Sequence, residues 1–154
     1  MDTLYLLLKF LHVAGVIVWV GGAVTLVVLN SRMAATGDAA AMAALGRQSE
    51  AVGAAVIGSA AVLAVLAGFG AAGVGRWSFG LLWIVWGIIG FILSMLVGVV
   101  AVQRTAKELS GLAREAGPGD SRVASLQGRM RTLNAINLLL LASVVWAMVF
   151  KPTL

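Results

Sequence analysis

The sequence has no cysteine and few charged residues. Without cysteine, disulfides, thiolate zinc sites, cysteine-ligated iron–sulfur clusters and cysteine nucleophiles are ruled out. Charged residues make up 11% of the chain and hydrophobic residues 61%, against about 25% and roughly 45–50% in soluble domains. This composition excludes a water-soluble monomer. The sequence also lacks a phosphate-binding glycine loop, a catalytic triad and any acidic residue inside its apolar runs.

Four apolar runs dominate the 154 residues, and a bilayer accepts such runs as helices of about 20 residues. They cover about residues 4–29, 52–72, 80–102 and 134–150. We therefore predict an all-α fold, a transmembrane four-helix up-down bundle that forms one integral membrane domain over residues 1–154.

The two long connections, residues 30–51 and 103–133, are also predicted to be helical. Asp38 follows a glycine and is placed to cap the first of these helices, and Asp120 or Ser121 is placed to cap the second. Apolar residues then recur along one face of the second: Val123, Leu126, Met130 and Leu133. The chain is thus expected to form two helical hairpins that extend beyond the membrane on one side.

The net charge of +5 is explained by topology. Eight basic residues fall in the two long connections: Arg32, Arg47, Arg104, Lys107, Arg114, Arg122, Arg129 and Arg131. Three belong to the other side: Lys9, Arg76 and Lys151. This bias predicts that the long connections are cytoplasmic and both termini outside, in the inner (plasma) membrane of a cell. The basic residues are expected to touch anionic lipid head groups, and no nucleic-acid partner is expected.

Small residues at helical spacing predict where the helices pack, because lipid removes most of the hydrophobic drive for helix association. One such stripe consists of Ala60, Ala64, Gly68 and Ala72, and another of Gly90, Ser94 and Gly98. Asn137, near the start of the last span, is expected to hydrogen-bond across the bundle.

His12 is the single histidine and lies in the first apolar run. A titratable side chain inside a membrane is costly and suggests function. On a helix it shares a face with Gly15, Trp19 and Gly22, which together would make a groove for haem or a metal ion. The alternative is that His12 only hydrogen-bonds a neighbouring helix.

Two methionines are candidate soft ligands for copper or haem iron, with core filling as the alternative role. With both termini outside, Met148 lies in the same half of the membrane as His12, and Met95 lies in the opposite half. Trp77 and Trp83 fit an interfacial aromatic belt, while Trp86 lies deeper and can face His12.

Residues 9–13 (KFLHV) and 19–22 (WVGG) resemble the first helix of bacterial CopD-type copper-resistance membrane proteins. They resemble more strongly the small, uncharacterised four-helix membrane proteins related to that family, as do residues 148–152 (MVFKP). The layout is also similar to that of HemJ-type protoporphyrinogen oxidases, and this likeness implies haem b ligation by His12. The chain departs from these families in having no second histidine, no methionine-rich motif and no lysine in the third span.

Three functions follow as hypotheses. The first is a membrane protein that binds haem b or copper through His12, with Trp19 and Met148 contributing. The second is a small oligomeric permease or copper-transport component, and the third a non-catalytic partner subunit of a membrane complex. General acid–base catalysis would depend on one histidine with no carboxylate in any span, which argues against it. A redox role through a bound cofactor stays open.

Overall fold

The computed structural model describes residues 2–36, 39–116 and 120–152. Within these residues the regular structure is entirely helical. Four helical stretches in this part are long and apolar enough to cross a membrane: Thr3–Thr36, Ala44–Val74, Leu82–Leu112 and Ser121–Phe150. The prediction of an all-α protein with four membrane-spanning helices is confirmed.

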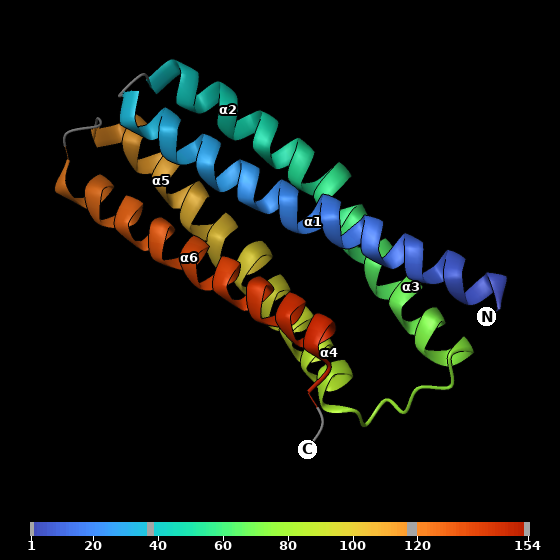
Figure 1. Ribbon diagram of the computed structural model, residues 1–154. Helices are drawn as coiled ribbons and strands as arrows, with labels where there is room; N and C mark the ends of the chain where they lie inside the picture. Colours follow the sequence, from blue (N-terminus) through green and yellow to red (C-terminus); the bar gives the residue numbers. More distant parts are fainter. Residues whose placement is uncertain (1, 37–38, 117–119, 153–154) are drawn as a thin grey trace. The chain divides into compact units, whose positions relative to one another are not determined.

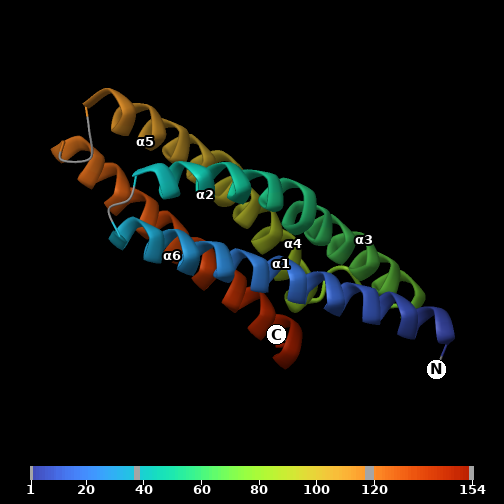
Figure 2. The ribbon, with the colours of Figure 1, turned by 90° about the horizontal axis from the view of Figure 1, so that it is seen from above.

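The chain divides into two compact units, a first hairpin (Met1–Leu81) and a second hairpin (Leu82–Leu154). In the first hairpin, α1 (Thr3–Thr36) runs antiparallel to a rod made of α2 (Ala39–Val52), the π-helical segment η1 (Gly53–Gly58) and α3 (Ser59–Val74). Figures 1 and 2 both show α1 lying alongside this rod.

The second hairpin begins with a rod of α4 (Leu82–Met95), the π-helical segment η2 (Leu96–Val102) and α5 (Gln103–Ala116). Helix α6 (Ser121–Phe150) returns antiparallel along it (Figure 1). The helical connections predicted for residues 30–51 and 103–133 are thereby confirmed over their described parts. Asp120 is the N-cap of α6, and its carboxylate accepts a hydrogen bond from the Arg122 amide at 2.8 Å. The predicted cap at Asp38 lies outside the described residues.

Large apolar side chains remain exposed along both hairpins. The exposed fractions of Ile17, Leu66, Leu139 and Val149 all exceed three-fifths. At about 1.5 Å per residue, α1 with its 34 residues is roughly 51 Å long, well beyond the hydrocarbon thickness of about 30 Å. These exposed faces are suited to lipid, and the helix ends extend past the apolar layer.

The predicted small-residue stripe of the second span packs against α1. Ala60 and Ala64 are buried, and α1 meets them at Gly15, its one buried residue in the described part. A Cβ added at Gly15 would lie 2.9 Å from the Ala60 carbonyl oxygen and 3.0 Å from the Ala64 amide nitrogen. The two backbones therefore approach each other as closely as glycine permits, as expected for helix pairs in lipid.

The stripe of the third span packs in the same way against α6. A Cβ added at Gly90 would clash with Cγ2 of Val144, and one added at Gly87 would clash with Cε of Met148. Ser94 is 4% exposed and its hydroxyl donates a 2.8 Å hydrogen bond to the Asn137 side-chain oxygen. The predicted hydrogen bond of Asn137 to another helix is thus confirmed, with Ser94 as its partner.

Each rod has a π-helical segment, a feature the sequence did not predict. A π turn leaves carbonyls without their usual partners four residues on, and a hydroxyl can compensate. Ser59 follows η1 and donates to the Ala55 carbonyl at 2.6 Å. Thr105, which is fully buried, donates to the Ala101 carbonyl of η2 at 2.9 Å.

Helix α3 ends in a tight turn. The Trp77 amide donates to the Ala72 carbonyl at 2.9 Å and the Arg76 amide to the Gly73 carbonyl at 3.1 Å, the pattern of a Schellman motif. Arg76 has a φ of 54°, in the left-handed region where glycine is usual. The short connection between the second and third spans therefore starts at a defined end of α3.

Candidate functional site

The candidate site centres on His12, two and a half turns into α1. Its side chain is half-buried and reaches across to α3, where Nδ1 lies 2.6 Å from the Ala64 carbonyl oxygen. A carbonyl can only accept, so Nδ1 carries the proton and donates. In the neutral ring the lone pair then resides on Nε2.

Gly68 allows this arrangement. A Cβ at this position would lie 2.8 Å from His12 Nδ1 and 3.1 Å from Cε1, so the imidazole rests directly on the α3 backbone. Ala64 and Gly68 are four residues apart on one helix, and hence on the same face. The small-residue stripe thus provides both the space and the acceptor for His12.

The predicted groove along α1 is filled by α3 and η1. Gly15 contacts the backbone of α3, and a Cβ at Gly22 would lie 2.7 Å from Cγ1 of Ile57. Trp19 lies between these two glycines in sequence and is half-buried. The face that carries His12, Gly15 and Gly22 is therefore a helix-packing face.

Met148 belongs to the second hairpin, so His12 and Met148 are held by different units. The terminal methyl group of Met148 packs on Gly87 of α4. Trp86 also finds its partner inside the second hairpin, because its indole N–H donates to the Ser143 hydroxyl at 3.2 Å. For both side chains the observed contacts are those of helix packing. Pairing of either with His12 stays a prediction.

The described residues contain no group of three or more His, Cys, Asp and Glu side chains that could hold a metal ion. Nε2 of His12 has no hydrogen-bond partner among these residues. The chemistry available at this site is consequently that of one oriented imidazole nitrogen.

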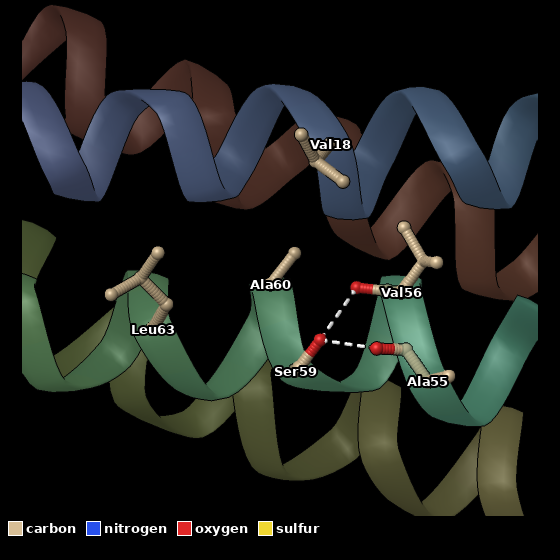
Figure 3. A pocket seen from close by; sticks show the side chains of 6 residues that line it. All are labelled: Val18, Ala55, Val56, Ser59, Ala60 and Leu63. Atoms are coloured by element: carbon tan, nitrogen blue, oxygen red, sulfur yellow. Dashed lines mark hydrogen bonds between the residues drawn. The ribbon is translucent and has the colours of Figure 1, made fainter.

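A depression of about 480 Å³ lies elsewhere in the first hairpin, beside η1, and its lining is mostly apolar. Figure 3 shows that the Ser59 hydroxyl on its floor is turned back to the carbonyls of Ala55 and Val56. The only side-chain hydroxyl of the lining is therefore already engaged with its own helix. The depression offers a ligand shape but no free polar anchor, and we do not assign it as the site.

At the C-terminal end of α6, the ammonium group of Lys151 lies 5.3 Å from the centre of the Trp83 ring. Trp146 stacks on Phe150 with 5.3 Å between ring centres. Aromatic rings and a lysine at one end of a span are typical of the membrane–water interface, which supports the predicted interfacial role of Trp83.

Sequence reasoning found His12, Asn137 and both stripes, but it missed Ser94 as the donor to Asn137 and Ser143 as the acceptor for Trp86. It also missed both π-helical segments. Glycines frame the first of these segments, at positions 53 and 58, and this was the available signal. The acceptor of His12 is a backbone carbonyl, which has no sequence signature.

The chain matches a known protein family over most of its length. Residues 6–152 match the family model described as predicted integral membrane protein (DUF2269). No curated protein and no solved structure matches the chain. Because the match covers nearly the whole chain, and the described residues contain four helices able to span a membrane, this protein belongs to the DUF2269 family of predicted integral membrane proteins.

Proposed function

We propose that this protein is a haem b-binding membrane protein in which His12 supplies an axial ligand to the iron. The observation that carries the proposal is the 2.6 Å hydrogen bond from His12 Nδ1 to the Ala64 carbonyl. Histidines that ligate metals usually donate their other ring N–H to a carbonyl or carboxylate, which fixes the tautomer and the orientation of the ring. The same arrangement at His12 leaves Nε2 as the ligating atom.

A single histidine favours haem over a bare copper ion. A porphyrin supplies four nitrogen ligands of its own, so one imidazole is enough to hold it. Copper needs its ligands from the protein, and the described residues contain no cluster of histidines and carboxylates. The apolar surroundings of a span also suit a macrocycle that is mostly hydrocarbon.

The packing of α1 on α3 limits how haem can approach. The side of α1 that carries Gly15 and Gly22 is occupied by α3 and η1, so the ring must reach Nε2 from outside the first hairpin. A second axial ligand would come from the His12 of a second copy of the chain. Bound haem would give the protein one-electron redox chemistry.

The test is an absorption spectrum and metal analysis of protein purified in mild detergent after expression with a haem precursor. We expect a Soret band from the wild type and its loss in His12→Gln, whose amide can still donate to the Ala64 carbonyl but cannot ligate iron. In His12→Gly, added imidazole should restore the band. Ser143→Ala is the control, because it removes the acceptor of a polar contact within the second hairpin and leaves His12 intact.

Wild-type protein without a Soret band under haem supply would refute the proposal, and so would an unchanged band in His12→Gln. Copper that is bound by the wild type, lost in His12→Gln and unaccompanied by haem would favour the copper-transport alternative instead.

A further inference from the structure

We propose that the second hairpin binds the head groups of anionic phospholipids around a basic collar of Arg104, Lys107, Arg129 and Arg131. This inference is independent of His12 and of the proposed haem. It rests on the positions of these four residues along α5 and α6 and on the scarcity of ion-pair partners for their side chains.

The depth of the collar follows from the helix geometry. The apolar run of the third span ends at Val102, and that of the fourth begins at position 134. At 1.5 Å per residue, Arg104 and Lys107 lie about 3 and 8 Å beyond the first boundary. Arg129 and Arg131 lie roughly 8 and 5 Å beyond the second. The head-group layer on each side is about 5–8 Å thick, so all four residues fall within it.

Two contacts between the antiparallel helices fix the level at which the two pairs meet. Ser94 bonds Asn137 inside the span, and Glu108 lies 4.0 Å from Arg129 at the outer end of the collar. Arg104, Lys107 and Arg131 all fall between these contacts along their helices. The four cations therefore surround one level of one hairpin.

Few acidic groups compensate the positive charge of the collar. Its four side chains are exposed. The side chains of Arg104, Lys107 and Arg131 have no ion-pair or hydrogen-bond partner in the described part of the chain. Glu108 is the one acidic residue at this level of the hairpin, and its contact with Arg129 is long and more than half exposed on both sides, so it contributes little.

Phosphodiester groups are the anions present at this depth of any phospholipid bilayer, and a lipid with a net negative charge complements three uncompensated cations. Each Lys or Arg near an anionic lipid surface strengthens binding about fivefold. Farther out, by contrast, Arg122 is already bound to Asp120 at 2.8 Å. Three of the four collar cations are unpaired, and all four lie at the level of the head groups, which distinguishes the collar from Arg122.

The experiment is native mass spectrometry of the full chain released from micelles that contain equal amounts of phosphatidylglycerol and phosphatidylcholine. We expect the wild type to retain phosphatidylglycerol preferentially. Arg104→Gln with Arg131→Gln should weaken that retention by roughly 25-fold, the product of two fivefold losses. The matched control is Arg114→Gln with Arg122→Gln, which removes the same charge about 18 Å from the apolar boundaries and should change retention less than about twofold.

Equal losses in the two double variants would overturn the site, because overall charge and not the collar would then attract the lipid. Equal retention of both lipids by the wild type would also overturn the proposal. Should the double collar variant be poorly folded, Arg104→Gln and Arg131→Gln are measured singly, and each should weaken the retention of phosphatidylglycerol about fivefold.

Discussion

The close approach of α1 and α3 at Gly15 gives the sharpest prediction about stability. In Gly15→Ala the new methyl group would lie 2.9 Å from the Ala60 carbonyl oxygen and 3.0 Å from both the Ala64 amide nitrogen and Cβ. Two of these three atoms are backbone atoms, which cannot rotate away. The helices must therefore separate locally, and the neighbouring contacts of the seam loosen with them.

Gly21 on the same helix provides the control, because a Cβ there would meet nothing within 4 Å. Replacing a mid-helix glycine by alanine stabilises a helix by up to about 1 kcal/mol, and this gain is common to both positions. Overpacking a tight interface costs typically about 1–3 kcal/mol. We expect Gly21→Ala to be neutral or stabilising, and the free energy of unfolding of Gly15→Ala to fall about 1–3 kcal/mol below that of Gly21→Ala.

Reversible unfolding in mixed micelles, followed by circular dichroism as the fraction of denaturing detergent rises, measures both free energies. Because the sequence has no cysteine, cysteines introduced at Ile17 and Leu66 can be labelled selectively. These positions are exposed on α1 and α3, so the distance between the two labels reports directly on opening of the first hairpin. Equal free energies of unfolding for the two variants would refute the close packing described for this hairpin.

Two further predictions concern the second hairpin. Ser94→Ala should lower the free energy of unfolding by about 0.6–2 kcal/mol, because it removes the buried donor to Asn137. A double-mutant cycle with Asn137→Leu measures the coupling between the two side chains. Ser110→Ala serves as the control, because the Ser110 hydroxyl bonds a carbonyl of its own helix. Hydrogen bonds from Arg122 lower the pKa of the Asp120 carboxyl, so its support for the start of α6 is complete above the ordinary aspartate value of about 3.9 and is lost as the pH falls through the lowered value. The Arg122 amide resonance, followed by NMR during acid titration, should shift only at that lower pH, and a midpoint at or above 3.9 would contradict the assignment.

The helices and their packing faces were determined by the sequence itself. Apolar runs of span length can satisfy their backbone polar groups in lipid only by forming helices, so four spans follow from composition and length. Small residues at i+4 spacing identify one face of a helix whatever its neighbour is, which is why Ala60, Ala64 and Gly68 were recognised as a packing stripe. The cap at Asp120 is equally local, since it depends on residues within one turn.

The partners of the polar side chains were decided only by the tertiary structure. His12 bonds a backbone carbonyl that every residue possesses, and the choice of Ala64 depends on the register of α1 against α3. The same packing closed the face that the sequence offered as a groove, because the glycines that permit a ligand to approach also permit a helix to do so. Periodicity shows which side of a helix is small or polar, but the element that covers that side is set by long-range packing, and this is what made Ser94 the partner of Asn137 and left Nε2 as the free nitrogen of His12.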